Sequence, residues 1–219
     1  MASVKQATEV RQEQIARAAL SVIGQDGMKG FTTVRIAREA GTSEANLYRH
    51  FKNKDAILLA LIDTIRETLL VSLKTRGKDA SALGRLEHLF RENLRFIEEN
   101  RGIPRLLTSS DLVFTKQLRR RWHSTIQQYL KTVEVLLERG KEEGSVDKGL
   151  DAGAAASIFL AMVQHTSLDW VLGDFRLSPV EAGMRLWSVY REIIGSAEER
   201  APSGAAPRKP RSVKRGGRK

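Results

Sequence analysis

The sequence predicts an all-α protein, and three observations support that fold class. Apolar residues recur at spacings of three and four along almost the whole chain, which is the period of amphipathic helices. No segment alternates apolar and polar residues as a half-buried strand does. Helix-capping and helix-ending residues stand between the periodic segments. With 219 residues, 41% of them hydrophobic, the chain can form one domain of ordinary size or a small domain fused to a larger one.

The N-terminal quarter is predicted to begin with three helices and to lead into a long fourth. They are expected over residues 8–26, 32–41, 43–51 and 53–77. Gly27 follows the first helix as a natural stop. Thr32 and Thr33 open the second helix and Ser43 opens the third, because hydroxyl side chains are good N-caps. Gly41 lies in the turn between them.

Four further helices are predicted, over residues 79–100, 114–143, 151–172 and 178–194. Pro104 breaks the chain between the first two, and Pro179 stands at a helix start, where its missing N–H costs little. The final stretch "APSGAAPRKPRSVKRGGRK" has almost no large apolar residue, so we expect it to be disordered. The expected parts are therefore 1–54, 55–195 and a basic tail, 196–219.

The net charge of +11 is concentrated at the two ends of the chain. Residues 1–54 hold nine Lys and Arg against five Asp and Glu, whereas residues 55–200 hold 21 of each. Residues 201–219 hold seven basic residues and no acidic one. Basic ends on a neutral body suggest a polyanionic partner. For the tail alone, solubility is an equally good explanation.

Several classes of protein are disfavoured by what the sequence lacks. It has no cysteine, no apolar run near the about 20 residues that span a bilayer, and no apolar segment typical of a signal peptide at its start. The histidines do not pair at helical spacing, and no Gly-x-Ser-x-Gly or glycine-rich phosphate loop occurs. We therefore expect a cytoplasmic, nucleoid-associated protein that is not an enzyme, with no metal and no cofactor.

The second and third helices, joined by "EAGTS", predict a helix-turn-helix unit. Its apolar side is Ile36, Ala37, Ala40, Leu47 and Phe51. The opposite side carries groups suited to DNA, namely Thr33, Ser43, Glu44, Ala45, Asn46, Tyr48, Arg49, His50 and Lys54. Hydroxyls, helix N-termini and lysine hold phosphates, while amide and guanidinium groups read base edges. A solvated helix face is the alternative for any single residue, but not for the whole spacing.

The stretch "FTTVRIAREAGTSEANLYRHFKNKDAIL", with the helix before it, resembles the TetR/AcrR-type transcriptional regulators over roughly residues 8–61. The resemblance implies a homodimer that binds a palindromic operator in double-stranded DNA, usually as a repressor released by a small molecule. It also implies DNA contacts at all the residues given above except Arg49. Thr42 departs from the family, which usually has Val there, and we expect it to loosen the turn slightly.

An effector pocket is predicted around the stripe that runs through "RRRWHSTIQQYL". Its candidate wall is Phe90, Leu94, Phe114, Trp122, His123, Ile126, Met162 and His165. A mainly apolar wall with histidines as polar groups favours an apolar or amphipathic effector. Packing of the same residues in a core explains the pattern almost as well.

The last two helices are apolar on more than one side, which suggests two partners. One is the rest of the chain and the other is the same pair in a second chain. The candidate interface is Ala155, Phe159, Met184, Trp187, Tyr190 and Arg191. Deeper burial within one chain is the alternative. A second functional hypothesis is a TetR-like protein controlled by a protein partner, or organising DNA, without a small-molecule effector; a closed, fully packed body would favour it.

Overall fold

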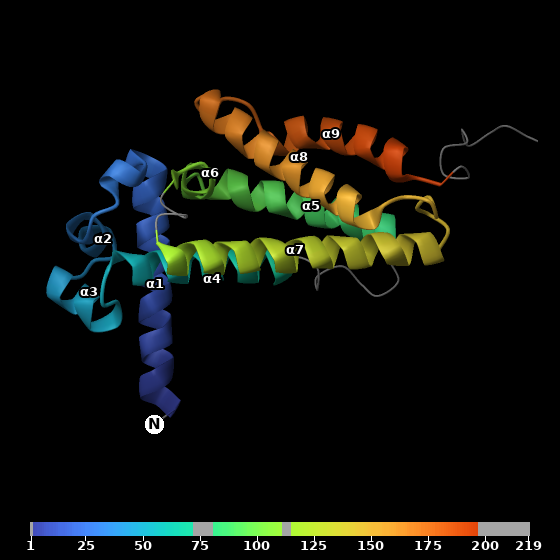
Figure 1. The fold of residues 1–219 in the computed structure, drawn as a ribbon. Helices are drawn as coiled ribbons and strands as arrows, with labels where there is room; N and C mark the ends of the chain where they lie inside the picture. The colour runs from blue at the N-terminus through green and yellow to red at the C-terminus, as the bar shows by residue number, and fades with distance from the viewer. Residues whose placement is uncertain (1, 72–80, 111–114, 197–219) are drawn as a thin grey trace, which may run out of the picture.

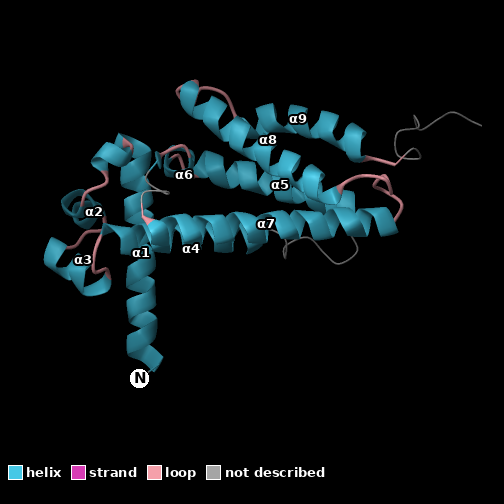
Figure 2. Ribbon diagram, viewed as in Figure 1, coloured by secondary structure: helices cyan, strands magenta, loops and turns pink. Residues whose placement is uncertain are grey.

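The computed structural model describes residues 2–71, 81–110 and 115–196. Figure 2 shows that these residues are almost entirely helical, and the only paired extended backbone among them is an isolated bridge between Val146 and Gly195. The all-α prediction is therefore confirmed. The elements are α1 (Ala2–Asp26), the short 3₁₀ helix η1 (Met28–Gly30), α2 (Thr33–Glu39), α3 (Glu44–His50), α4 (Lys54–Val71), α5 (Ala82–Glu99), α6 (Gly102–Leu107), α7 (Lys116–Glu142), α8 (Ala152–Leu172) and α9 (Pro179–Ile194).

The helices form a small N-terminal lobe and a longer helical body (Figure 1). In the lobe, α1 packs against α2, α3 and the first part of α4. In the body, α7 packs along α4, α5 and α8, while α9 packs against α5 and α8. Helix α6 packs against α1, so the body meets the lobe there as well as through α4.

Side-chain caps fix the helix starts, as the sequence predicts for Thr32 and Ser43. In each case the capping oxygen accepts a hydrogen bond from the backbone N–H three residues on, which satisfies a donor that the helix itself cannot. The capping residues are Thr32, Ser43, Ser81, Thr115, Asp151 and Ser178.

Helix α6 is an element that the sequence did not predict. Pro104, expected to break the chain, lies in the first turn of this six-residue helix. Its missing N–H costs nothing there because the first N–H groups of a helix have no partner within the helix. Four predicted segments lie partly outside the described residues. They are the fourth helix beyond Val71, the helices over 79–100 and 114–143 at their first residues, and the tail over 197–219.

A single apolar core runs from the lobe into the body. Ile15, Ile36 and Leu47 are buried in the lobe, and Ile57 and Ile62 of α4 continue the same cluster toward the body. The predicted inward residues Ile36, Ala37, Leu47 and Phe51 are all buried, and Ala40 is partly buried against them. Helix α4 therefore belongs to both parts, and it connects them through its own buried face.

An aromatic cluster fills the centre of the body. The Phe159 ring lies 5.3 Å from Phe90 and 6.2 Å from Trp187, measured between ring centroids. The Tyr190 hydroxyl donates a 2.8 Å hydrogen bond to the carbonyl of Ala155. Edge-to-face aromatic packing of this kind adds to the hydrophobic stabilisation of a core. These rings pack against one another within one chain, which bears on both the predicted pocket and the predicted interface.

Candidate nucleic-acid interface and interior cavity

The turn between α2 and α3 has a fixed geometry. Gly41 adopts a positive φ of 60°, a conformation that a residue with a Cβ rarely takes. The Thr42 N–H then donates to the Ala37 carbonyl at 2.9 Å. Ile36 and Leu47, both fully buried, lie on the inner sides of the two helices. The outer side of α3 is consequently held at a defined angle to α2.

The nine predicted DNA contacts all lie on the lobe, at the start of α2, along α3 and at the start of α4. Ser43, Ala45, Tyr48, Arg49 and Lys54 are exposed, while Thr33, Glu44, Asn46 and His50 are half-buried. The Thr33 hydroxyl donates to the Glu44 carboxylate, which joins the two helix starts. The His50 carbonyl accepts a 3.2 Å hydrogen bond from the Gln12 side chain of α1.

Two half-buried members of this set are oriented by their surroundings. The Asn46 amide donates to the Thr42 hydroxyl at 2.8 Å, so Thr42 orients a candidate base-reading group. Nδ1 of His50 is buried without a hydrogen-bond partner among the described residues. Only the other edge of that ring can face DNA.

The structure adds three exposed side chains to this face. Thr32 and Val34 flank Thr33 at the start of α2, and Lys52 lies between α3 and α4. An exposed valine in a short polar helix is suited to contact a thymine methyl group. Its place beside the capping threonines is the signal by which the sequence could have identified it.

A cavity of about 40 Å³ lies inside the body, where α4, α5, α6, α7 and α8 meet. Its wall is almost wholly apolar and includes Ile65, Leu69, Asn93, Phe96, Ile97, Ile103, Leu107, Trp122, Thr125, Ile126, Tyr129, Leu160, Val163 and Gln164. The Asn93 amide, 1% exposed, donates to the Tyr129 hydroxyl. Burial raises the pKa of the Tyr129 phenol, so the phenol stays protonated and available as a donor.

The predicted pocket residues are divided among several environments. Trp122 and Ile126 line the cavity. Phe90 and Leu94 are fully buried in the core instead, and Met162 is half-buried against it. His123 and His165 are exposed, which corrects their assignment as polar groups of the pocket. Phe114 lies outside the described residues.

Asn93 is a buried polar residue of the cavity wall that was not predicted from the sequence. It is the single polar residue on the buried side of α5, among Leu86, Leu89, Phe90, Leu94 and Ile97. A polar residue on an apolar stripe needs a buried hydrogen-bond partner, and that is the signal by which it could have been found.

The predicted interface residues also need correction. Ala155, Phe159, Trp187 and Tyr190 are buried within the protomer, so they cannot form the surface on which a second chain packs. Met184 is partly buried against the same core, and Arg191 is exposed. The cause is close packing of α9 on α5, where a Cβ added to Gly183 would lie 2.2 Å from Cδ1 of Leu94.

A different apolar face is open on α8 and α9, which lie side by side in Figure 1. Ile158 is 51% exposed and Val189 is 56% exposed, and Leu168 and Ile193 are exposed as well. Ala154 and Ala161 are also exposed on α8, and their small side chains leave room for another helix to approach closely. The second apolar side that the sequence predicted for these helices is therefore present, with other residues.

Helix α6 connects the cavity with α1. Ile103 and Leu107 line the cavity. On the other side of the same helix, a Cβ added to Gly102 would lie 2.1 Å from the Leu20 carbonyl oxygen, and one added to Gly24 would lie 3.1 Å from the Gly102 nitrogen. The backbones of α1 and α6 are thus in direct contact.

Among the described residues, no three His, Cys, Asp or Glu side chains gather in a way that could hold a metal ion. None of the helices in these ranges combines the length and apolarity needed to cross a membrane.

Comparisons with known proteins cover nearly the whole described chain. Residues 15–61 match the bacterial regulatory proteins of the tetR family, and residues 58–189 match the C-terminal region of YsiA-like proteins. The nucleoid occlusion factor SlmA of Klebsiella pneumoniae (strain 342) is 31% identical over 193 residues, which cover 85% of this chain and 96% of that protein.

Solved structures share the fold. The transcriptional regulator FadR from Bacillus subtilis in complex with stearoyl-CoA matches with a TM-score of 0.69 and 23% identity, over 83% of this chain and 98% of that one. AibR in complex with isovaleryl coenzyme A and operator DNA matches with a TM-score of 0.64 and 21% identity, over 82% and 97% of the two chains.

Proposed function

The chain belongs to the tetR family of bacterial regulatory proteins, and from this we propose how it regulates transcription. It is a DNA-binding transcriptional regulator. We propose that two copies bind the two halves of a palindromic operator, and that a small, mainly apolar effector releases them. Residues 1–54 form the DNA-binding part, residues 55–195 form the effector-binding and dimerising part, and the protein acts at the nucleoid by binding and not by catalysis.

The DNA contacts are divided between phosphates and bases. Thr33, Ser43 and Lys54 lie at helix starts, where hydroxyls, backbone N–H groups and an ammonium group suit phosphate oxygens. Asn46 and Arg49 on the outer side of α3 suit base edges in the major groove. The exposed ring of Tyr48 can lie against the sugar while its hydroxyl reaches a phosphate.

Control by an effector is supported above all by one observation, the apolar cavity between α4 and α6. Ile65 and Leu69 on α4, together with Ile103 and Leu107 on α6, form part of its wall. Helix α4 begins at the candidate phosphate contact Lys54, and α6 touches α1 at Gly102. A ligand that binds more tightly to the conformation with a wider cavity would displace both helices. This displacement would change the position of the lobe and lower the affinity for DNA.

Dimerisation through the open face of α8 and α9 is supported by its exposed Ile158, Leu168, Val189 and Ile193. Two such faces packed about a two-fold axis would make a four-helix interface. Such an arrangement gives two recognition helices, which a palindromic operator requires. Their separation in the DNA-bound dimer would be about 34–36 Å, one turn of DNA.

A second candidate function is supported by the size of the cavity. About 40 Å³ holds only a few water molecules, well below the roughly 300 Å³ at which ligand pockets begin. A body that stays closed would suit control by a protein partner, or a role in organising DNA. The nucleoid occlusion factors SlmA among the relatives make this a specific alternative.

A thermal-shift screen followed by DNA release separates the two functions. Acyl compounds, free and as coenzyme A esters, are the first set to test because the cavity wall is apolar. We expect at least one to raise the unfolding temperature and to weaken operator binding. Ile126→Trp, which fills the cavity, should abolish both effects, whereas Val135→Trp on the exposed side of α7 should preserve them. Stable DNA binding with no stabilising compound in a broad screen would favour the partner-controlled function.

A further inference from the structure

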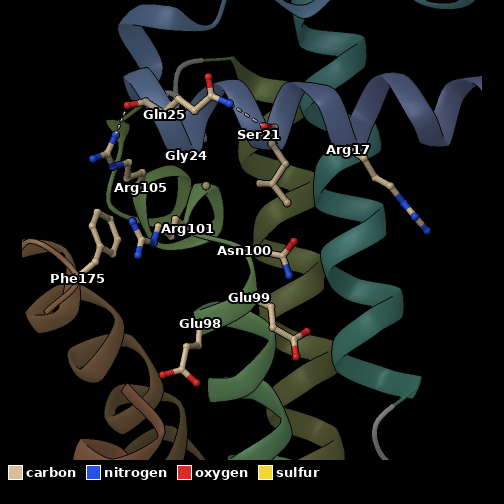
Figure 3. Close-up of a pocket in the computed structure, with 12 residues that line it drawn as sticks. Arg17, Ser21, Gly24, Gln25, Glu98, Glu99, Asn100, Arg101, Arg105 and Phe175 are labelled. Carbon is tan, nitrogen blue, oxygen red and sulfur yellow. Dashed lines mark hydrogen bonds between the residues drawn. The ribbon is translucent and has the colours of Figure 1, made fainter. Parts of the chain in front are cut away.

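A second, polar cleft lies between the lobe and the body, on the far side of α6 from the apolar cavity. Its volume is about 650 Å³, which is within the usual range of small-molecule sites. One wall is α1, from Arg17 to Gln25, and the opposite wall is the corner where α5 passes into α6. Phe175, from the loop between α8 and α9, closes one end (Figure 3).

Two arginines share the ring that closes this end. The guanidinium carbon of Arg101 lies 5.1 Å from the centre of the Phe175 ring, and that of Arg105 lies 5.2 Å from it. In Figure 3 the Arg101 side chain lies beside the ring and Arg17 points away from it. The Arg105 guanidinium also donates a hydrogen bond of 3.1 Å from one of its terminal nitrogens to the Gln25 carbonyl, which leaves its other N–H groups for a ligand. Neither guanidinium forms an ion pair with a carboxylate among the described residues. The two positive charges therefore both lie next to the Phe175 ring, and neither is paired with a carboxylate of the described residues.

The position of Phe175 is imposed by a strained loop. Asp174 and Phe175 have positive φ angles of 52° and 59°, which are unfavourable for residues with a side chain. The Phe175 N–H donates to the Trp170 carbonyl at 2.9 Å, and the two rings meet edge to face with centroids 4.8 Å apart. Backbone strain that the surroundings enforce is typical of sites where a side chain must be placed for binding.

The remainder of the cleft offers hydrogen-bond acceptors. The Asn100 amide nitrogen donates to the Phe96 carbonyl at 2.9 Å, which leaves its side-chain oxygen as an acceptor. Glu98 and Glu99 carry their carboxylates below Asn100 in Figure 3, away from Phe175. One end of the cleft therefore suits an anion, and the other suits hydroxyl or amino groups.

We propose that this polar cleft binds a phosphate-bearing small molecule. Its phosphate lies between the guanidinium groups of Arg101 and Arg105, whose paired N–H donors match phosphate oxygens, and its hydroxyl or amino groups lie toward Asn100, Glu98 and Glu99. A phosphate carries enough charge for two guanidinium groups, which a single carboxylate does not. Nucleotides have both parts and a suitable size, so they are the first members of the class to test.

The binding test uses the full chain and isothermal titration calorimetry. The probes are ADP, inorganic pyrophosphate and glucose 6-phosphate, with adenosine as the probe without phosphate. We expect saturable binding of at least one phosphate compound, one molecule per chain, and binding of adenosine at least roughly tenfold weaker, because charge-assisted hydrogen bonds to phosphate are lost. Arg101→Gln and Phe175→Leu should each weaken binding of the phosphate compound roughly tenfold. Arg119→Gln, on the exposed side of α7, removes one positive charge as Arg101→Gln does, so it serves as the charge-matched control and should change the affinity less than about twofold.

Several results would overturn the proposal. One is the absence of saturable binding of any phosphate probe at about 1 mM, a concentration that corresponds to a binding free energy of only about 4 kcal/mol. The others are an affinity loss in the α7 control equal to that in the cleft variants, and an unchanged affinity in both cleft variants. Saturable binding of an acidic peptide in place of the phosphate probes would assign the cleft to a protein partner and would also overturn it. Circular dichroism melting curves check that each variant is folded.

Discussion

The side-chain amide of Asn46 donates a hydrogen bond of 2.8 Å to the hydroxyl of Thr42. Thr42, a residue of the turn, thus orients Asn46 on the candidate recognition surface. Similar regulators usually have valine at the position of Thr42. With one amide hydrogen engaged, the Asn46 oxygen and its second hydrogen remain for a base. The turn and the base contact are therefore parts of one hydrogen-bonded unit.

Thr42→Val should consequently lower sequence discrimination more than overall DNA affinity. Loss of the acceptor frees the Asn46 amide to rotate, so affinity for a sequence selected from random DNA should fall by roughly 1 kcal/mol while affinity for unrelated DNA stays the same. Fluorescence anisotropy with the two DNAs measures both. Thr132→Val on α7 is the matched control. An equal loss on both DNAs would show that Thr42 acts on the fold of the turn.

Tyr48→Ala and Lys54→Ala should both weaken operator binding without unfolding the protein. Tyr48 is 50% exposed and Lys54 is exposed, so neither supports the core. Loss of one phosphate contact should lower the slope of log affinity against log salt concentration by about 1 for Lys54→Ala. Gel-shift series at several salt concentrations give that slope. Lys148→Ala, which removes an exposed charge in the loop between α7 and α8, should leave the slope unchanged.

Asn93→Ala should destabilise the body, because it leaves the buried Tyr129 hydroxyl without its partner. The expected cost is about 1–3 kcal/mol of unfolding free energy. Combining Asn93→Leu with Tyr129→Phe removes both polar groups and should cost less than the sum of the two single changes. Urea unfolding of the four proteins of this cycle measures the coupling. Additive losses would mean that the two side chains do not interact in solution.

Val189→Glu should dissociate the dimer and leave a folded monomer. It places a charge on the open face of α8 and α9, where Val189 is 56% exposed. Trp187→Glu lies only two residues away but is 3% exposed, so it should unfold the body instead. Sedimentation velocity together with circular dichroism separates the two outcomes. A Val189→Glu dimer as tight as the wild type would place the interface elsewhere.

Because of Glu143, the free energy of unfolding should depend on pH in the acidic range. Its carboxylate accepts hydrogen bonds from the Ala82 N–H and the Arg139 side chain, both at 2.7 Å, and the bond from Ala82 contributes most to lowering its pKa below the ordinary 4.5. A lowered pKa in the folded state stabilises the protein above pH 4.5, and that contribution is lost as the pH falls further. Glu143→Gln should therefore lower the melting temperature at pH 7, and the difference from the wild type should shrink as the pH falls below 4.5. Melting curves from about pH 3 to 7 test this. A deficit that does not change with pH would assign the effect to packing.

The fold and the exposed side of the helix-turn-helix unit could be predicted because their signals are local. Capping hydroxyls, the glycine of the turn and the apolar spacing all act within a few residues of Gly41. They determine which side of α3 is buried against Ile36 and which is exposed. The resemblance to known regulators then predicted that the exposed side contacts DNA.

The cavity and the interface depend on contacts between distant helices, which periodicity does not specify. Phe90 and Trp187 have the same apolar character as the cavity residues, but they stack on each other with centroids 5.8 Å apart and fill the core. Helix α8 is apolar nearly all round, so its sequence alone did not tell which side meets α7 and which remains open. His123 and His165 were assigned by chemical suitability, and their helical phase directs them to solvent.

The contact between Gly24 and Gly102 has a consequence for chimaeric regulators. Because α1 and α6 meet there through backbone atoms, the joint depends on the absence of side chains and not on which side chains are present. A body taken from another protein of this fold should fit this lobe if it carries glycine at the position of Gly102, even where its effector pocket differs entirely. An alanine at that single position should make the hybrid fail, since its methyl group would have to occupy the space of the Leu20 carbonyl oxygen.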